Sequence, residues 1–305
     1  MSIPAVSHAR TLRRYIADGE TRLVVSGYDA LTAKTAAMAG IEVLHLTGYG
    51  AAAALAGAPD IGLLSVTEMA GACARMVEAA DRPLIADIDT GYGNALNVRR
   101  TIRTMETAGA AGIHLEDQVH PKRCGHMAGK RVVPVEEMVA KVKAACDARR
   151  DDDFVIIART DANAIEGLDA TLERAARYRE AGADMLFVEA PTSREEIVRI
   201  AGCGLGPQLF NWAYDGLTPH VPIGWLRELG FPLVLYADVA QVVHRAFAGF
   251  VERLVAAGSL DDVRDLVTGF DAFNSFVGLE EWRELEERYG AAADPGGPGA
   301  PETEG

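Results

Sequence analysis

Two aspartates, Asp87 and Asp89, stand two positions apart at the end of the apolar run Leu84–Asp89, which predicts a buried strand. Alternate side chains of an extended strand share one side, so the two carboxylates point the same way. Glu116 ends the next apolar run along the chain. We therefore expect three carboxylates at one edge of the fold.

Three carboxylates in one place repel one another unless a cation neutralises them. Hard divalent cations prefer oxygen ligands, so this set suits magnesium or manganese rather than zinc. We predict a Mg²⁺ site, with Mn²⁺ as the alternative metal, formed by Asp87, Asp89 and Glu116. The other interpretation is a structural network in which these acids pair with Arg and Lys or stay solvated.

A segment rich in basic residues, QVHPKRCGHMAGKRVVP at 118–134, is too long for a simple turn between a strand and a helix. Nearby cations either favour the thiolate of its one cysteine, Cys124, or hold the thiol ready as a proton donor. Gly125 and Gly129 give the backbone the freedom that an active-site lid requires. A solvated loop with an incidental cysteine is the alternative. The cationic or titratable residues around the thiol are Lys122, Arg123, His126, Lys130 and Arg131.

Arg159 ends another apolar run, within ARTDA, and a guanidinium can hold a carboxylate through two parallel hydrogen bonds. The alternative for Arg159 is an ion pair with Glu116 or Glu189. His45 and His114 lie inside predicted strands, and we expect them to be hydrogen-bonded core residues.

Eight short runs of aliphatic and β-branched residues alternate with helix-like segments. Most runs are continuously apolar, which is typical of parallel strands covered on both faces. Strict alternation of eight strands with helices predicts a (β/α)8 barrel of the TIM type rather than an open sheet. The predicted strands are Leu23–Gly27, Val43–Gly48, Leu84–Asp89, Gly112–Asp117, Phe154–Asp161, Met185–Ala190, Gln208–Trp212 and Leu233–Asp238. The predicted helices between them include Thr67–Ala80, Ala95–Ala108, Val135–Arg149, Leu168–Ala181, Arg194–Ala201 and Pro222–Leu229.

In such barrels the chemistry lies at the carboxyl ends of the strands. All eight predicted strands reach polar residues at these ends, which indicates one convergent pocket. The ends are Ser26-Gly27, Thr47-Gly48, Asp87-Ile88-Asp89, Glu116-Asp117, Arg159-Thr160-Asp161, Glu189, Asn211 and Asp238.

A helical extension is predicted after the eighth strand, over Ala240–Ala257, Asp261–Val267 and Ala272–Arg288. The last of these carries an apolar stripe that must be buried against the barrel or a partner chain, and we expect a neighbouring subunit. The stripe consists of Phe273, Phe276, Leu279, Trp282, Leu285 and Tyr289. We predict one domain over residues 1–290 and a disordered tail over 291–305, which is rich in Ala, Gly, Pro and Glu.

The composition narrows the class of protein. The chain has 305 residues, 49% of them hydrophobic, and a net charge of −14, so it has ample material for a core. The acidic excess argues against nucleic acid or an anionic membrane as the main partner. No run has the length of a membrane helix and residues 1–22 lack a signal-peptide core, so we expect a cytoplasmic protein with reduced cysteines. Apart from Cys124, these are Cys73, Cys146 and Cys203, which we expect to fill buried space or to lie in helices.

With these motifs the sequence resembles the isocitrate lyase/phosphoenolpyruvate mutase superfamily, in particular its methylisocitrate lyase-like branch. Within that branch it is most similar to 2,3-dimethylmalate lyase-like and carboxyphosphonoenolpyruvate mutase-like members. The match runs in order over roughly residues 8 to 290. The matching segments are SGYDALTAK (26–34), GAPDIGLLS (57–65), ADIDTGYGN (86–94), LEDQVHPKRCGH (115–126), ARTDA (158–162), FVEAP (187–191) and the TP within Gly216–Pro219.

The resemblance implies a magnesium-dependent lyase that breaks the C2–C3 bond of a 2-hydroxy di- or tricarboxylate. The products would be pyruvate or glyoxylate and a second carboxylic acid. Asp87 and Asp89 would hold the metal, directly or through water, with Asp60 and Glu116 in the same water network. A phosphonomutase, an oxaloacetate decarboxylase and a barrel that binds an oxo acid without turnover remain alternatives.

The resemblance also implies roles for the basic segment. Cys124 would protonate the second product, with its proton held ready by Lys122, Arg123 and His126, and Glu116 would belong to the same catalytic set. The residues implied to contact the substrate are Thr47, Gly48, Tyr49, Asp60, Gly125, Arg159, Glu189 and Asn211. The family further implies a homotetramer that exchanges its C-terminal helices.

Two segments depart from the family pattern. At the seventh strand Tyr214 stands where the family lyases have Glu, in an N-x-x-E-x-G segment that begins here at Asn211. At the eighth strand the usual tyrosine-proline-leucine-serine becomes Tyr236-Ala237-Asp238-Val239. Both positions lie near the far end of the substrate, so we predict a distal group that is bulkier or less acidic.

Overall fold

The structure is a computed structural model that describes residues 7–290. The tail predicted over 291–305 lies outside the described residues. The chain divides into two compact units, Met1–Val242 and Val243–Gly305.

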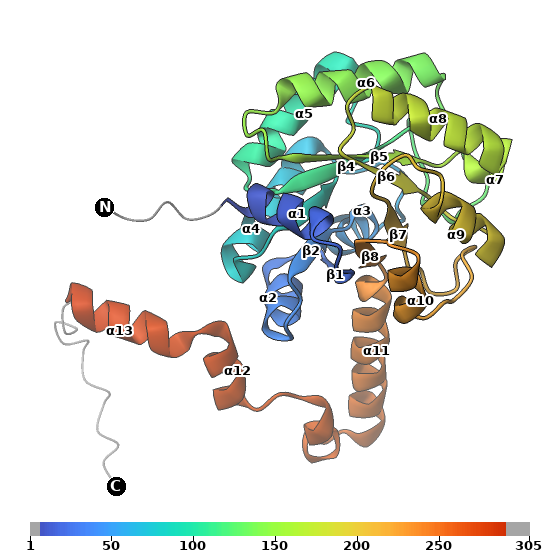
Figure 1. Cartoon of the computed structure of the whole chain (residues 1–305). Coiled ribbons are helices and arrows are strands. Elements are labelled where there is room, and N and C mark those ends of the chain that lie inside the picture. The colour runs from blue at the N-terminus through green and yellow to red at the C-terminus, as the bar shows by residue number, and fades with distance from the viewer. Residues whose placement is uncertain (1–6, 291–305) are drawn as a thin grey trace, which may run out of the picture. The chain divides into compact units, whose positions relative to one another are not determined.

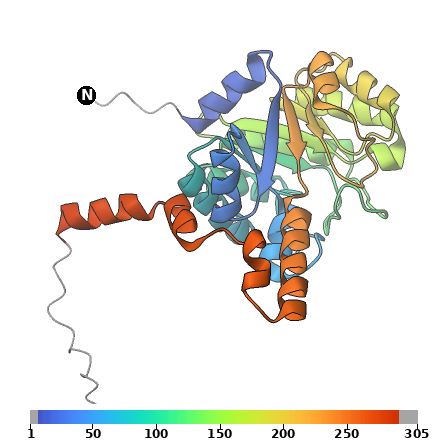
Figure 2. The same ribbon diagram turned by 90° about the horizontal axis from the view of Figure 1, so that it is seen from below.

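Eight parallel strands form a nearly closed barrel in the first unit (Figure 1). Their hydrogen-bonded order is β6-β5-β4-β3-β2-β1-β8-β7, and Figure 2 shows the first and last strands, β1 and β8, side by side. The seam between β6 and β7 is bridged where Leu186 pairs with Gln208. The predicted barrel is confirmed, with every strand end within two residues of its prediction. The strands are β1 (Arg22–Gly27), β2 (Val43–Leu46), β3 (Leu84–Asp87), β4 (Gly112–Glu116), β5 (Val155–Thr160), β6 (Met185–Val188), β7 (Leu209–Asn211) and β8 (Leu233–Tyr236).

Helices cover the outside of the barrel, and Ala95–Thr107 and Val135–Ala148 match their predictions to within one residue. No pattern in the sequence indicated the helices at residues 8–17, 48–56 and 163–166. The elements are α1 (His8–Ala17), α2 (Ala30–Met38), α3 (Gly48–Ala51), the π-helical η1 (Ala52–Ala56), α4 (Val66–Ala80), α5 (Ala95–Thr107), α6 (Val135–Ala148), α7 (Asn163–Glu166), α8 (Leu168–Glu180), α9 (Arg194–Ala201) and α10 (Ile223–Glu228).

Alternate residues of each strand face the barrel interior and the surrounding helices. Val43 and Ile85 belong to the interior cluster, whereas the residues that follow them, Leu44 and Ala86, pack with the outer helices. Both faces of the strands are therefore dry, which is the physical reason for the continuous apolar runs in the sequence. Leu12 of α1 joins the interior cluster and lies over Gly112, at the amino end of β4.

The second unit is helical and continues from α11 (Val239–Ala257), which begins in the first unit. It contains the 3₁₀ helix η2 (Asp261–Leu266), α12 (Phe270–Val277) and α13 (Leu279–Tyr289). The prediction of one helix over Ala272–Arg288 is wrong. Gly278 adopts a left-handed backbone conformation, with φ of 91°, and this ends α12 before α13 begins. None of the helices within residues 7–290 is long and apolar enough to span a membrane.

We expect Leu12→Ala to destabilise the barrel, because it leaves a cavity under a fully buried side chain. A loss of about 2–5 kcal/mol corresponds to a melting temperature lower by roughly 5–15 °C in a differential scanning measurement. Leu96→Ala is the matched control, since Leu96 is 77% exposed. Equal melting temperatures for the two variants would contradict the role of α1 in the core.

Candidate active site

A cavity of about 230 Å³ lies at the carboxyl ends of the barrel strands. Ten of the predicted residues line it, and the basic segment 118–134 contributes to its wall. Those ten are Thr47, Tyr49, Asp60, Asp87, Cys124, Gly125, His126, Arg159, Glu189 and Asn211. Five predicted residues do not line the cavity: Gly48, Asp89, Glu116, Lys122 and Arg123.

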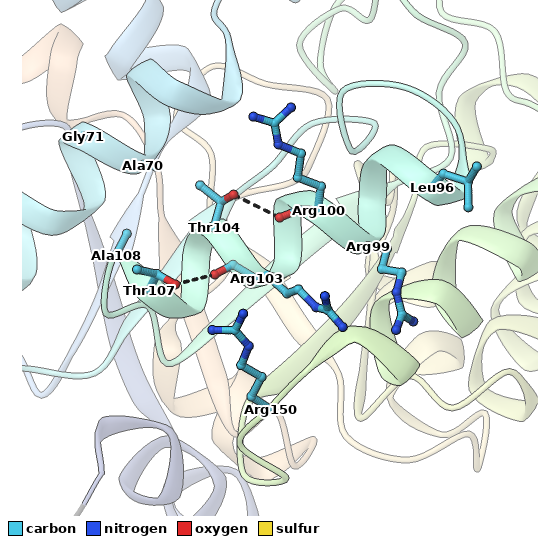
Figure 3. Close-up of a pocket in the computed structure, with 10 residues that line it drawn as sticks. All are labelled: Ala70, Gly71, Leu96, Arg99, Arg100, Arg103, Thr104, Thr107, Ala108 and Arg150. Atoms are coloured by element: carbon cyan, nitrogen blue, oxygen red, sulfur yellow. Dashed lines mark hydrogen bonds between the residues drawn. The ribbon is translucent and has the colours of Figure 1, made fainter.

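A second, larger surface depression of about 660 Å³ lies beside α5 (Figure 3). Four guanidinium groups line it, those of Arg99, Arg100, Arg103 and Arg150. Its described lining contains no carboxylate, thiol or imidazole, so it offers none of the acid–base chemistry found at the barrel mouth.

The carboxylate of Asp87 is fixed by backbone donors. Its Oδ1 accepts a hydrogen bond from the N–H of Asp89 at 2.9 Å, and its Oδ2 accepts one from the N–H of Gly48 at 3.3 Å. A Cβ at Gly48 would lie 2.9 Å from Asp87 Oδ2 and 3.2 Å from Asp89 Oδ1. Both carboxylates therefore face one point, and only glycine leaves that space open.

The side chain of Lys122 is buried between two acids. Its Nζ lies 2.6 Å from Asp60 Oδ1 and 2.8 Å from Asp89 Oδ1. Burial opposes the charge, but the facing carboxylates raise the pKa of Lys122 well above its ordinary value. Burial raises the pKa of Asp89 to about 6, against the effect of Lys122. Lys122 thus comes from the basic segment into the acid cluster that the sequence predicted.

Glu116 is fully buried, and neither of its carboxylate oxygens has a hydrogen-bond partner within residues 7–290. Burial raises the pKa of Glu116 well above its ordinary value. In the same range no three His, Cys, Asp or Glu side chains converge closely enough to enclose a metal ion. Magnesium keeps several waters and takes only one or two carboxylates directly, so an open set of oxygen donors suits it. The unsatisfied Glu116 oxygens fit a cation bound through water.

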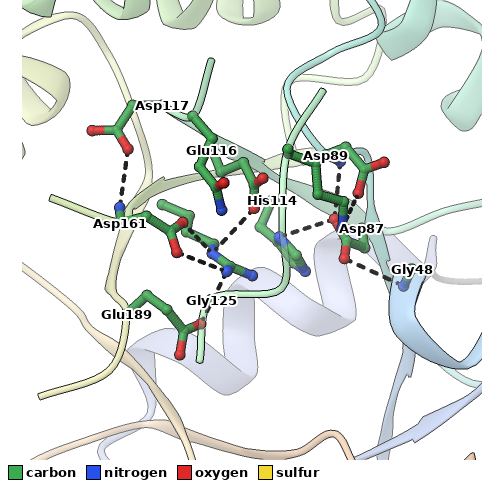
Figure 4. Close-up of polar contacts among 12 residues, drawn as sticks. Gly48, Asp87, Asp89, His114, Glu116, Asp117, Gly125, Asp161 and Glu189 are labelled. Carbon is green, nitrogen blue, oxygen red and sulfur yellow. Dashed lines mark hydrogen bonds and ion pairs between the residues drawn. The ribbon is translucent and has the colours of Figure 1, made fainter. Parts of the chain in front are cut away.

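Arg159 forms ion pairs with three carboxylates, those of Glu116, Asp161 and Glu189. Figure 4 labels these three acids. Its Nε and Nη2 donate to Asp161 at 2.9 and 3.1 Å, and it lies 3.4 Å from an oxygen of Glu116 and of Glu189. The ion pairs considered as an alternative are confirmed. Among the described residues, Arg159 contacts these acids through Nε and Nη2, so the two N–H groups of Nη1 are left for a ligand in the cavity that Arg159 lines.

His126 attaches the basic segment to the barrel. Its Nδ1 accepts a hydrogen bond from the N–H of Leu217 at 3.0 Å, so its proton lies on Nε2. That nitrogen is 3.0 Å from Glu189 Oε1, which also accepts from Asn211 Nδ2 at 3.2 Å. Arg159 holds the pKa of Glu189 below its ordinary value in spite of burial. Both nitrogens of His126 are engaged in holding the segment.

Cys124 is a half-buried free thiol. Burial raises its pKa to about 11, so the thiol stays protonated at neutral pH. Of the two states that the sequence left open, the structure favours the proton donor over the thiolate. The side chain of Arg123 is exposed and Lys122 pairs with acids, so neither neutralises a thiolate here.

His45 and His114 are buried and hydrogen-bonded, as expected, but both also line the cavity. Their Nε2 atoms are 2.8 Å apart, His45 Nδ1 is 2.8 Å from Ser26 Oγ, and His114 Nδ1 is 3.6 Å from Asp87 Oδ1. Burial lowers the pKa of His45 to about 3, so it is neutral. The two histidines were not expected in the site, although His114 stands two residues before Glu116 and therefore on the same side of β4.

The cavity wall at the ends of β7 and β8 differs from the side that holds Asp87, because its carboxylate is already hydrogen-bonded and apolar residues lie beside it. Asp238 Oδ2 accepts a hydrogen bond from the N–H of Tyr214 at 2.7 Å, and Oδ1 accepts one from Gln241 Nε2 at 3.1 Å. The carboxylate is thus used to hold the loop. Leu235 and Ala237 line the cavity beside it and contribute apolar surface.

Comparisons with known proteins point to one family. The sequence model of the phosphoenolpyruvate phosphomutase family matches residues 12–255. A 2,3-dimethylmalate lyase of Eubacterium barkeri is 43% identical over 282 residues, which are 92% of this chain and 98% of the relative. A crystal structure of a 2,3-dimethylmalate lyase, described as a PEP mutase/isocitrate lyase superfamily member, has a TM-score of 0.88 and 33% identity, and the match covers 97% of this chain and all of that one.

A structure of phosphonopyruvate hydrolase in complex with oxalate and Mg²⁺ has a TM-score of 0.85 and 27% identity, and the match covers 93% of this chain and 99% of that one. The family match, the identity to the lyase over nearly the whole chain and the shared barrel all agree. The chain therefore belongs to the phosphoenolpyruvate phosphomutase family, within the PEP mutase/isocitrate lyase superfamily.

Proposed function

We propose that the protein is a magnesium-dependent carbon–carbon lyase that cleaves a 2-hydroxy di- or tricarboxylate into pyruvate or glyoxylate and a second carboxylic acid. The observation that carries the proposal is Cys124, a protonated thiol in the same cavity as Arg159 and Asp87. This cleavage needs a proton donor for the second product, a cation that binds the substrate carboxylate, and carboxylates that hold the metal. The similarity to a 2,3-dimethylmalate lyase over 92% of the chain supports it.

Asp87, Asp89 and Glu116 are the residues that would hold Mg²⁺, or Mn²⁺, directly or through water. When bound, the metal would act as a Lewis acid on the oxygens at C1 and C2 of the substrate. The complex of a family relative with oxalate and Mg²⁺ supports a metal beside a small dicarboxylate.

The residues of the chain divide the remaining work. Arg159, with Thr47 and Gly48 at the end of β2, orients the carboxylate next to the hydroxyl carbon. Loss of the hydroxyl proton to solvent lets the C2–C3 bond break, and the electron pair of that bond passes to the second acid as an enolate. Cys124 gives its proton to that carbon, and solvent then returns a proton to the sulfur.

The far end of the cavity supports a distal group that is bulkier or less acidic. Asp238 accepts hydrogen bonds from Tyr214 and Gln241, while Leu235 and Ala237 contribute apolar surface. A carboxylate placed there would gain no cation from these residues, whereas an alkyl group would be desolvated favourably. We therefore place alkyl-substituted malates ahead of tricarboxylates as substrates.

A phosphonomutase is the second candidate, because the family model that matches residues 12–255 is that of phosphoenolpyruvate phosphomutase. The same cavity would then rearrange a phosphorus–carbon skeleton instead of releasing two acids. A mutase has less need of a buried proton donor, so the thiol of Cys124 favours the lyase.

We expect release of a 2-oxo acid from 2,3-dimethylmalate or a related malate in the presence of Mg²⁺, measured by coupling to lactate dehydrogenase. Cys124→Ala should lower kcat by about 10²–10⁴-fold with little change in KM, because the proton donor acts after binding. Cys203→Ala, which follows α9 and does not line the cavity, is the control and should keep normal turnover. If phosphorus NMR shows rearrangement of carboxyphosphonoenolpyruvate and no malate or isocitrate is cleaved, the lyase proposal is wrong and the protein is a mutase.

Calorimetry tests the metal site independently of turnover. We expect Mg²⁺ to bind the wild-type protein, and Asp87→Asn to weaken binding by about 10–100-fold, because a carboxylate is the preferred ligand. Asp147→Asn removes an exposed carboxylate of α6 and is the matched control. Equal Mg²⁺ affinity for the three proteins would refute the assignment.

The C-terminal helices support a homotetramer that exchanges them. Within residues 243–290 only Val263 is buried, while Phe270 and Trp282 are 82% and 68% exposed. An apolar surface of this kind is typical of an interface between subunits. Light scattering should give about 130 kDa, four chains of 32.5 kDa, and Trp282→Glu should lower that mass. Arg283→Glu is the control on the same helix, and a wild-type monomer would contradict the proposal.

A further inference from the structure

Lys130, in the basic segment, has a buried side chain that the proposed reaction does not use. Its Nζ donates to the carbonyl oxygen of Gly125, next to Cys124, and lies 3.3 Å from Asp161 Oδ1. Only 2% of the Lys130 side chain is exposed, and Asp161 is fully buried. By contrast, Arg123 and Arg131 of the same segment are exposed.

Burying an ammonium group is costly unless partners compensate for the lost water. A loop that only carried surface charge would leave all its cations in solvent, as Arg123 and Arg131 do. Lys130 instead turns inward and joins two parts of the chain, the thiol segment and the end of β5. This burial indicates a role in holding them together.

Asp161 is itself firmly held. Its two oxygens accept hydrogen bonds from Arg159 at 2.9 and 3.1 Å, and its N–H donates to Asp117 Oδ1 at 2.9 Å. Asp117 also accepts from Thr160 at 2.7 Å. The carboxylate that receives Lys130 is therefore the same one that orients the guanidinium.

The basic segment packs directly against Arg159 and Glu189 at Gly125. A Cβ at Gly125 would lie 2.5 Å from Arg159 Nη2 and 2.5 Å from Glu189 Cγ, so the backbone there has no clearance. Any outward shift of Gly125 carries Cys124 with it, because the two residues are adjacent. A tether on the Gly125 carbonyl thus sets the position of the thiol relative to Arg159.

We propose that Lys130 and Asp161 are positioning residues, which hold the Cys124–Gly125 segment against Arg159 so that proton donor and carboxylate clamp keep a fixed separation. The consequence for turnover depends on the proposed lyase reaction. The tether itself does not, because it rests only on the contacts of Lys130, Gly125 and Asp161.

Protection of the thiol tests the tether without any substrate. Lys130→Met removes the donor but keeps a side chain of similar length, and it should free the segment. Alkylation of Cys124 by iodoacetamide, followed by mass spectrometry of the peptide, should become about 10-fold faster or more as the thiol opens to solvent. Cys146 and Cys203 serve as internal references, and Lys143→Met, an exposed lysine of α6, is the matched control.

Circular dichroism and the melting temperature establish that Lys130→Met is folded. Lys130→Arg is a second variant, since it keeps a charged donor at the position and should restore part of the protection. An alkylation rate of Cys124 within twofold of wild type in folded Lys130→Met would overturn the tether. So would equal rates in Lys130→Arg and Lys130→Met when both exceed the wild-type rate.

Turnover gives a readout that loss of stability alone would not change. With 2,3-dimethylmalate, Lys130→Met should lower kcat by about 100-fold, with KM within threefold of wild type, because misplacing a catalytic group acts after binding. In D₂O the wild type should release propionate deuterated on one face of C2, and the variant should release a mixture. Retained single-face deuteration at normal kcat would overturn the positioning role.

The two proposals fail in different ways. If the wild-type protein cleaves no malate or isocitrate, the lyase proposal is wrong. Faster alkylation of Cys124 in Lys130→Met would still support the tether. Normal cleavage by the wild type, together with unchanged alkylation and turnover in Lys130→Met, removes the tether and leaves the lyase.

Discussion

The burial of Arg159 among Asp161, Glu116 and Glu189 is the constraint on which the barrel mouth depends. Three carboxylates out of water repel one another, and each would be costly without a cation. One guanidinium donates hydrogen bonds to Asp161 and lies 3.4 Å from an oxygen of Glu116 and of Glu189, because its planar fork has several donors in fixed directions. This arrangement fixes the ends of β4, β5 and β6 relative to one another. Arg159 is also the one arginine or lysine among the residues that line the cavity.

The basic segment supplies the cations that pair with acids at the strand ends and in the loops after them. The strand ends and the loops after them supply acids, and residues 118–134 return with Lys122 for Asp60 and Asp89 and with Lys130 for Asp161. A chain with a net charge of −14 thus concentrates cations where its own acids are buried. The segment is held in place by ion pairs rather than by apolar contacts alone.

The position of Cys124 follows from the same contacts. Its thiol lies where burial keeps it protonated, beside a glycine that cannot be replaced without meeting Arg159 and Glu189. His126 anchors the other side of that glycine through Glu189 and the N–H of Leu217. The cations around the thiol in the sequence therefore serve its position more than its ionisation.

The sequence alone determined the barrel and its eight strands, because strand periodicity and the polar strand ends are local properties. The family resemblance, rather than periodicity, named Tyr49, Asp60 and Gly125 among the residues that line the cavity. The sequence also singled out Asp87, Cys124 and Arg159 for chemistry. Only the tertiary structure decided which charges pair, since the partners of Lys122 and Lys130 lie far away along the chain. It decided likewise that His45 and His114 reach the cavity and that burial keeps the thiol of Cys124 protonated. Burial and pairing depend on every neighbour at once, and no single segment of the sequence contains them.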